Sequence, residues 1–428
     1  MLILVLIETK SNEVLAMTEK VYIMWENTCI AVLKADFDTT HVEVTNYIDD
    51  RFKLPFGLRE DITLDEYEGF LRYRCFPQRR ENAEQLLHTT GISFYAVRDI
   101  LKKTHGVKNE DKLWLSFGSY PAGEYSQLRA RESYNLFDHT DRGYKRNIAL
   151  DNALGIAHLR INPEFCIYNE LLTNGNQRKF RYRDTWYKLD FMGVEGLSEV
   201  LCSRLADALH LKHVEYKPLV QLDESGHSFN NVKNRGCTSK HFLGEDECEY
   251  TLYRLLAYHT GDMICLNMFN RPDIAAEARM EAATARMTPL VGEAVWKETL
   301  GTVLLFDYLT VNDDRHLNNI SFIYNQRTQT FKPAPLFDNG SALLSGLPVN
   351  ITDTGRLRAK PFSTSFTRQV NCCMKLLGYD SIPALEPRIT LAVDDLVMIY
   401  GAELVARAIW VLRNTLKTYN VKLEVADV

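Results

Sequence analysis

The chain lacks the long apolar segments and the charge excess that mark several large classes of protein. No stretch of its 428 residues approaches the roughly 20 consecutive apolar residues that a membrane-spanning helix needs. Its 50 Lys and Arg residues nearly balance its 56 Asp and Glu residues, for a formal net charge of −6. Such a balance creates no overall positive field toward nucleic acid or an anionic membrane. We therefore expect a soluble protein that binds neither of them directly.

The usual signs of a disulfide framework or a zinc site are also missing. The nine cysteines are odd in number and include no Cys-x-x-Cys pair. Residues 1–7 are apolar, but no basic residue precedes them and Glu8 follows directly, so the pattern does not predict a signal peptide. We expect a cytoplasmic protein, in which Met17 offers a second start and residues 1–16 would be an upstream extension.

Three common catalytic signatures are absent as well. The sequence contains no His-Glu-x-x-His, no Gly-x-Ser-x-Gly and no Gly-x-x-x-x-Gly-Lys-Ser/Thr. What the chain does have is an ordinary globular composition, with 46% hydrophobic and 25% charged residues. This composition predicts a large buried core rather than a disordered chain.

The first quarter of the chain has the pattern of a small α+β module. Residues 21–60 are rich in strand-forming side chains interrupted by Asn, Asp and Pro, which favours an antiparallel sheet. Thr63 and Glu66 form a capping-box pattern that predicts the start of a helix. A second helix is predicted from about Ser93 to Gly106. We expect an N-terminal module over residues 1–125 and, from the turn-rich and charged sequence that follows, a linker over 126–155.

The next hundred residues, 156–255, read as a second β-rich unit. Strands are expected at 165–168, 179–182, 186–189 and 214–216, with a turn at 173–176. Leucines at every fourth position predict an amphipathic helix over 197–210. The long polar segment 223–249 fits either a lid or substrate element or a plain surface insertion.

Residues 256–428 are predicted to be mainly helical. The longest helices are expected at 292–311 and 403–417. One segment, 312–341, interrupts them and is rich in Asp and Asn. The chemistry of the protein is therefore best sought there.

Asp314 and Asn319 lie in the most acidic part of this segment. Phosphoryl transfer needs a carboxylate that orients the attacking hydroxyl, together with an Asn and an Asp that hold metal ions. Asp314 and Asn319 are five positions apart, which is the spacing of the base and the metal-binding Asn in the kinase loop H-R-D-x-x-x-x-N. A hairpin predicted over 321–332 would return Asp338 to the side of Asn319. Such clusters also occur as solvated loops or helix caps, but the ordered spacing after an apolar helix favours a catalytic loop.

Lys188 is the cation expected to face the phosphates. It lies in the apolar strand 186–189, where a half-buried ammonium needs an anionic partner, although an outward-facing lysine would need none. Glu199, eleven positions later, is the preferred partner and Glu195 is the alternative.

The turn before this strand is the candidate phosphate loop. It contains Gly175, Gln177 and Lys179, and its backbone N–H groups could approach an anion closely. An Asn-Gly turn is also common in hairpins that bind no ligand.

These motifs together resemble the HipA family of serine/threonine kinases, which share a fold with protein kinases and, more distantly, with phosphatidylinositol 3/4-kinases. The resemblance covers about residues 156–428. It rests on these elements in chain order: Gly175-x-Gln177-x-Lys179, Lys188, Asn312-x-Asp314-x-His316-x-x-Asn319 and Asp338. It implies an α+β, bilobal protein-kinase-like fold, with a β-rich N-lobe at 156–255 and a helical C-lobe at 256–428, preceded by the N-terminal module.

The resemblance also implies roles for these residues. Asp314 would be the catalytic base and His316 would shape its loop. Asn319 and Asp338 would hold Mg²⁺. The nucleotide-binding residues for ATP would be Gly175, Gln177, Lys179, Lys188 and Glu199. In this family a serine in the phosphate loop can be autophosphorylated, which inactivates the enzyme. Here only Thr173 offers a hydroxyl in that stretch.

The function expected from this resemblance is ATP- and Mg-dependent phosphorylation of Ser/Thr in a protein substrate, by a toxin of a toxin–antitoxin system. A DNA-binding antitoxin would be its partner. Two alternatives remain open, namely a phosphatidylinositol-type lipid kinase and a nucleotide-binding pseudokinase or scaffold. The acidic charge balance and the lack of a basic amphipathic helix disfavour the first. Chemically competent side chains at the predicted catalytic positions disfavour the second.

Overall fold

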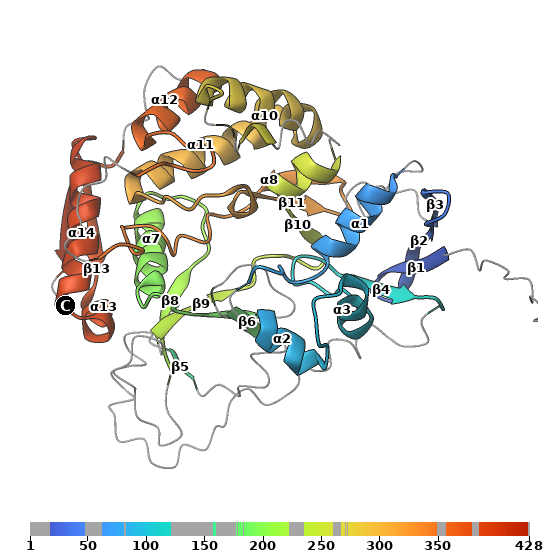
Figure 1. Cartoon of the computed structure of the whole chain (residues 1–428). Helices are drawn as coiled ribbons and strands as arrows, with labels where there is room; N and C mark the ends of the chain where they lie inside the picture. The colour runs from blue at the N-terminus through green and yellow to red at the C-terminus, as the bar shows by residue number, and fades with distance from the viewer. Residues whose placement is uncertain are drawn as a thin grey trace, which may run out of the picture.

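The structure is a computed structural model of the chain. It describes residues 18–47, 62–80, 83–120, 157–159, 177, 179–182, 184–221, 235–259, 267–269, 271, 273–348, 357–378 and 385–426. Within them the fold is mixed α+β, with four sheets and helices packed against them (Figure 1). The predicted α+β class is confirmed. The predicted linker at 126–155 lies outside the described residues, and the division into domains stays a prediction.

The N-terminal module contains the expected antiparallel sheet, in the order β3-β2-β1-β4. Its strands are β1 (Thr18–Trp25), β2 (Thr28–Asp36), β3 (His41–Asn46) and β4 (Leu113–Phe117). Val21 and Ile23, which alternate along β1, are both fully buried, as expected for a sheet with one face on a core.

The described part of this module also contains three helices: α1 (Leu64–Tyr73), α2 (Ala83–Thr90) and α3 (Val97–Thr104). The predicted capping box is present, because Thr63 Oγ1 accepts the Glu66 N–H at 3.2 Å and Glu66 Oε2 accepts the Thr63 N–H at 2.8 Å. α3 ends where expected, with His105 in the left-handed region at a φ of 53°. Tyr67, Phe70 and Leu101 pack with β1 in one apolar cluster.

A five-stranded sheet carries the β-rich part of the predicted site. Its strands are β5 (Ala157–Leu159), β6 (Lys179–Tyr182), β7 (Thr185–Leu189), β8 (Tyr216–Gln221) and β9 (Arg235–Lys240), in the order β5-β8-β9-β7-β6. The predicted hairpin of β6 and β7 is present. The strand expected at 214–216 begins at Tyr216, and the strand expected at 165–168 lies outside the described residues.

The central strand β9 corrects an expectation. Residues 223–249 were expected to form a lid or an insertion, yet Arg235–Lys240 pairs with both β7 and β8. This strand lacks the apolar alternation by which strands are recognised. A Cβ on Gly236 would lie 2.0 Å from the carbonyl oxygen of Lys188, so glycine permits this close pairing. The end of the same segment enters β10 (Glu247–Thr251).

Helix α7 (Glu195–Ala208) packs beside this sheet and matches the prediction of 197–210. Leu197, Leu201 and Leu205 are 3% exposed or less. Each such side chain contributes roughly 1.5–3 kcal/mol by leaving water. The helix is thereby fixed against β8 and β9.

The remainder is mainly helical, as predicted, but includes two small sheets. Its helices are α8 (Leu252–Arg254), the π-helix Leu255–His259, α10 (Ala276–Val291), α11 (Glu293–Thr310), α12 (Phe366–Leu377), α13 (Asp394–Tyr400) and α14 (Ala402–Lys417). The predicted hairpin is formed by β11 (Ser321–Asn325) and β12 (Thr330–Pro333), with β10 pairing on β11. The parallel pair of β13 (Arg388–Ala392) and β14 (Lys422–Ala426) was not predicted.

Figure 1 shows α10, α11 and α12 side by side, and α13 and α14 next to each other. α11 is the central helix of this group, with Trp296, Leu300 and Leu304 at most 1% exposed. Its C-terminal end leads directly into the Asp/Asn-rich segment. None of the helices in the described residues combines the length and hydropathy that a membrane span requires.

The N-terminal module contacts the rest of the chain through a buried ion cluster. Arg74 donates to both carboxylate oxygens of Asp111 at 2.7 and 3.0 Å, and Arg254 Nη2 donates to Asp111 Oδ2 at 3.3 Å. All three side chains are at most 1% exposed. The backbone N–H of Glu249 in β10 also donates to the carbonyl of Glu110 at 3.1 Å.

Candidate active site

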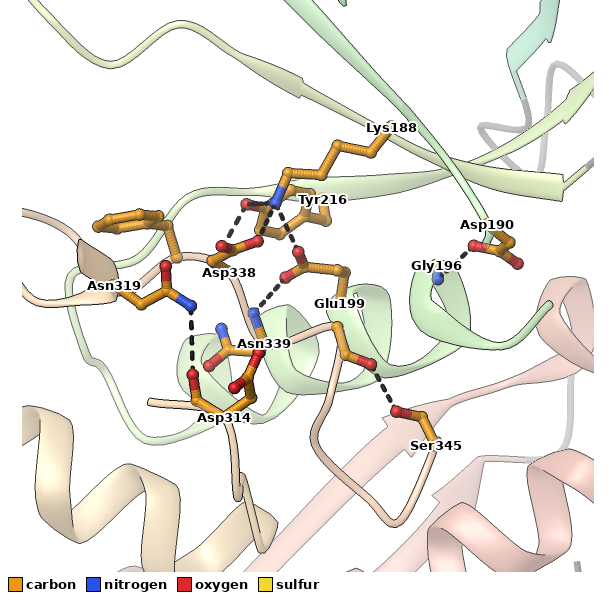
Figure 2. A network of polar contacts seen from close by, with 12 residues as sticks. Lys188, Asp190, Gly196, Glu199, Tyr216, Asp314, Asn319, Asp338, Asn339 and Ser345 are labelled. Carbon is orange, nitrogen blue, oxygen red and sulfur yellow. Dashed lines mark hydrogen bonds and ion pairs between the residues drawn. The ribbon is translucent and has the colours of Figure 1, made fainter. Parts of the chain in front are cut away.

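Lys188 is the centre of a buried ion-pair cluster (Figure 2). Its side chain is 9% exposed. Its Nζ donates to Glu199 Oε1 at 2.7 Å, to Asp338 Oδ1 at 2.8 Å and to the hydroxyl oxygen of Tyr216 at 3.2 Å. The ammonium of this β7 residue thus contacts side chains from α7, β8 and the loop after β12. The expected pair of Lys188 and Glu199 is present.

Glu195, the alternative partner, has another role. It is the first residue of α7, and its carboxylate accepts the backbone N–H groups of residues 192–194 at 2.7–3.2 Å. Negative charge is favoured at a helix N-terminus. Glu195 therefore stabilises the start of the helix, one turn before Glu199.

The turn at Asp338 and Asn339 connects this cluster to the second half of the site. Asp338 has a φ of 56°, a left-handed conformation that Asp tolerates better than bulkier residues. Its carboxylate faces Lys188, while the N–H of Asn339 donates to Glu199 Oε2 at 2.8 Å. Two consecutive residues of one turn therefore contact both members of the Lys188–Glu199 pair.

Arg315 joins this turn to the predicted catalytic loop. It is fully buried and donates to the carboxylate of Asp307 in α11 at 2.9–3.1 Å. It also donates to the carbonyl oxygens of Asn319 at 3.0 Å and Phe337 at 2.7 Å, and to Asn339 Oδ1 at 2.6 Å. One guanidinium thereby fixes the position of the predicted catalytic loop relative to the turn at Asp338 and Asn339. This accounts for the predicted return of the chain toward Asn319.

The loop itself is organised around the backbone of Asp314. The Asp314 N–H donates to Asn312 Oδ1 at 3.2 Å, and its carbonyl oxygen accepts the His316 N–H at 2.7 Å and Asn319 Nδ2 at 3.4 Å. The carboxylate of Asp314 is 42% exposed, with Oδ1 2.6 Å from Lys360 Nζ. His316 lies exposed at the surface. The backbone contact between His316 and Asp314 makes His316 a turn residue, and the carboxylate of Asp314 stays accessible.

Lys179 supplies a second cation beside Lys188. The two lysines are directly opposite each other in the β6–β7 pair, so their side chains leave the sheet on the same face. Gln177 has a buried side-chain nitrogen, Nε2, which has no hydrogen-bond partner among the residues that the structure describes. Lys179 therefore lies on the same face of the sheet as Lys188, and Gln177 lies two residues before it in the chain. Gly175 and Thr173 lie outside the described residues.

The electrostatics of the cluster follow from these contacts. Burial opposes the charged form of Asp338, but the ammonium groups of Lys188 and Lys179 outweigh it and hold the pKa of Asp338 well below its usual range. Burial likewise opposes the charged form of Lys188, yet Asp338 and Glu199 raise its pKa well above the usual value. Burial lowers the pKa of Lys179, the carboxylate of Asp338 opposes this shift, and the like charge of Lys188 adds to it. Lys179 would therefore gain from a further anionic partner.

Asn319 and Asp338 are the predicted ligands of Mg²⁺. Within the described residues, no group of three or more His, Cys, Asp and Glu side chains could hold a metal ion. Asn319 and Asp338 offer the hard oxygen ligands that Mg²⁺ takes, and Mg²⁺ is often bound by one or two carboxylates plus the phosphates of a substrate. The donor set thus fits a magnesium ion that binds together with a nucleotide.

Five residues of the candidate site were not predicted from the sequence: Tyr216, Asp307, Arg315, Asn339 and Lys360. Asp307 had a signal, since it is a lone carboxylate in the apolar run of α11, and a buried charge needs a partner. Lys360 had none, because it is 46 residues from Asp314 and only the fold brings the two together.

Comparison with known proteins supports the fold that the motifs predicted. No protein-family model matches the chain, and no curated protein matches its sequence. Among solved structures, it is similar to HipA from the Shewanella oneidensis MR-1 toxin–antitoxin system, solved with HipB and its operator DNA. The TM-score is 0.51 at 14% identity, over 94% of this chain and 100% of that chain. The Helicobacter pylori proinflammatory kinase CtkA matches with a TM-score of 0.32 at 14% identity, over 57% of this chain and 93% of that chain. The likeness to HipA shows the fold alone.

Proposed function

We propose that this protein is a HipA-type kinase that transfers the γ-phosphoryl group of ATP to a Ser or Thr hydroxyl of a protein substrate. The observation that carries the proposal is the Lys188 ammonium, held at 2.7 Å by Glu199 and at 2.8 Å by Asp338. A strand lysine paired with a helix glutamate and next to a metal-type aspartate is the arrangement that kinases use to hold nucleotide phosphates.

The proposed division of labour assigns one task to each part of the site. Lys188 and Lys179 bind the phosphates. The oxygen of the substrate hydroxyl forms a bond to the γ-phosphorus of ATP, and Asp314 accepts the proton of that hydroxyl. The bond between the γ-phosphorus and the oxygen of the leaving ADP breaks, and its electron pair stays on ADP. Asn319 and Asp338 would hold Mg²⁺, which neutralises phosphate charge when it is bound.

A protein substrate is favoured by the accessibility of Asp314. Its carboxylate is 42% exposed, so a hydroxyl on an extended segment can reach it without opening the fold. The Lys188 cluster is buried, and Figure 2 shows Asp314 apart from Lys188, with Asn319 and Asp338 between them. This arrangement supports separate approaches for the two substrates.

We further propose that the protein acts in the cytoplasm as the toxin of a toxin–antitoxin system, with a DNA-binding antitoxin as partner. The support is the HipA structure of similar fold, which is a complex with HipB and operator DNA. The net charge of −6 argues that contact with DNA would be made by the partner rather than by this chain.

Two other functions would use the same fold. A phosphatidylinositol-type lipid kinase would need a surface for anionic membranes, which the acidic balance disfavours. A pseudokinase or scaffold would bind nucleotide without turnover. The accessible Asp314 carboxylate and the intact Lys188 cluster favour an active enzyme over that alternative.

A phosphoryl-transfer assay separates these functions. γ-labelled ATP is offered with a mixed protein acceptor, a serine peptide or phosphoinositide vesicles, each with and without Mg²⁺. We expect Mg-dependent label on the protein or peptide. Label on the phosphoinositide alone would favour the lipid kinase. Nucleotide binding without label on any acceptor would favour the pseudokinase.

A further inference from the structure

Lys360 lies against the carboxylate of Asp314, although it comes from a different part of the chain. Its Nζ is 2.6 Å from Asp314 Oδ1, and the two side chains are 51% and 42% exposed. An ion pair this exposed contributes about 0–1 kcal/mol to folding. Stability therefore gives little reason for the contact.

The backbone around Lys360 is anchored far more firmly than that of an ordinary surface lysine. Gln369 of α12 is 1% exposed, donates to the carbonyl oxygen of Lys360 at 3.1 Å and accepts the N–H of Phe362 at 3.3 Å. Arg279 of α10 donates to the carbonyl of Phe362 at 2.5 Å. The N–H of Ala359 donates to the carbonyl of Thr364 at 2.7 Å. Buried side chains of two helices thus hold Lys360 beside the loop.

The predicted catalytic loop has no such cation of its own. Its arginine, Arg315, is fully buried and turned toward Asp307 and Asn339. Lys188 is already paired with Glu199 and Asp338. Among the described residues, Lys360 is the cation that pairs with Asp314.

We propose that Lys360 is a second catalytic cation, which rests on the proposed kinase function. With Oδ1 of Asp314 held by Lys360, Oδ2 is left to accept the proton of the substrate hydroxyl. As the hydroxyl oxygen bonds to the γ-phosphorus and the bond to ADP breaks, the ammonium stabilises the negative charge on the transferring phosphoryl oxygens and keeps its own protons. Lys360 would therefore act in the transition state, not in nucleotide binding.

The test compares three single variants of the full-length chain. Lys360→Met removes the charge, Lys360→Arg keeps it, and Lys297→Met removes the lysine of another exposed pair, with Glu293 at 2.7 Å in the first turn of α11. We expect Lys360→Met to lower kcat about 10²-fold, as for the loss of one preorganised donor. The KM for ATP and the Kd for MgADP should stay within about twofold of wild type, because only the transition state loses an interaction. Lys360→Arg should recover most of the rate, and Lys297→Met should match wild type.

A double variant shows whether Lys360 and Asp314 act as a unit. In an Asp314→Asn background, Lys360→Met should lower kcat much less than in the wild-type background. A Lys360→Met enzyme with the turnover of Lys297→Met would overturn the proposal and leave the kinase function intact. Faster turnover would overturn it too, by making the ion pair an inhibitory contact. A wild-type protein that labels no acceptor would defeat the kinase function itself, and this proposal with it.

Discussion

Lys188 neutralises Glu199 and Asp338 together, so its removal leaves a buried carboxylate without a cation. Breaking a buried pair by removing one partner costs about 3–5 kcal/mol. Because Asp338 is 26% exposed, we predict that Lys188→Met lowers the free energy of unfolding by an amount near the lower end of that range. It should also abolish the rise in Tm that MgATP causes in the wild type. Thermal unfolding with and without MgATP measures both effects.

A matched double variant separates folding from binding. Lys188→Met with Glu199→Gln removes both buried charges, so stability should recover while the nucleotide-induced shift stays absent. If Lys188→Met kept the full wild-type shift, the phosphates would have to bind elsewhere.

Asp190 makes stability depend on pH. It is 5% exposed, accepts the N–H of Gly196 at the start of α7 at 2.7 Å, and lies near Glu195. Burial, with a smaller contribution from Glu195, raises the pKa of Asp190 to about 7. The folded state therefore binds this proton more tightly than the unfolded state, so stability falls as pH rises from about 4 to about 7.

We predict that Asp190→Asn reduces the loss of stability that accompanies rising pH. The amide stays neutral over this range, and its oxygen can still accept the Gly196 N–H. Tm measured from pH 5 to pH 8 should fall less steeply for the variant than for the wild type. Asp307 and Glu249 also have raised pKa values, of about 6 and about 7, but they titrate in both proteins. Parallel curves would show that Asp190 does not carry the effect.

At the scale of elements, the close approach of β9 to β7 depends on glycine. We predict that Gly236→Ala lowers the free energy of unfolding by more than about 3 kcal/mol, because its Cβ would meet the Lys188 carbonyl oxygen at 2.0 Å and the backbone must shift. Gly346→Ala is the matched control, since a Cβ there meets nothing within 4 Å. Urea unfolding compares the two, and equal stabilities would contradict the tight pairing of β9.

Elements with local signals could be predicted from the sequence. The capping box at Thr63, the helix over 292–311 and the hairpin over 321–332 depend on neighbours in the chain and are all present. β9 was missed because its polar sequence is buried by partners that are distant in sequence, and the parallel β13–β14 pair had no short-range sign. The site divides in the same way. Sequence spacing identified Asp314, Asn319 and Asp338 as candidates. The choice of Glu199 over Glu195 depends on where helix α7 begins, because Glu195 caps that helix while Glu199 contacts Lys188. Lys360 could be found only from the tertiary fold, which brings it to Asp314.

For the whole molecule, the junction at Asp111 links the N-terminal module to β10 and α8. Arg74 and Arg254 hold the pKa of Asp111 below its usual value against the effect of burial. We predict that Asp111→Asn destabilises the protein by about 3–5 kcal/mol, because two buried guanidinium groups lose their shared carboxylate.

Asp273→Asn is the control for this junction, since its pair with Arg271 is about 60% exposed and should contribute less than about 1 kcal/mol. Chemical denaturation of the two variants measures the difference. Equal midpoints would show that the junction does not stabilise the molecule.

The most direct test of the account is phosphoryl transfer by Asp314→Asn. The amide keeps the size of the side chain but cannot act as the base, so turnover of γ-labelled ATP onto a protein acceptor should fall by at least about 10²-fold. Calorimetry on the same sample should give an unchanged Kd for MgATP, because the nucleotide is held by Lys188 and its neighbours. Wild-type turnover in Asp314→Asn would contradict the catalytic assignment of this loop.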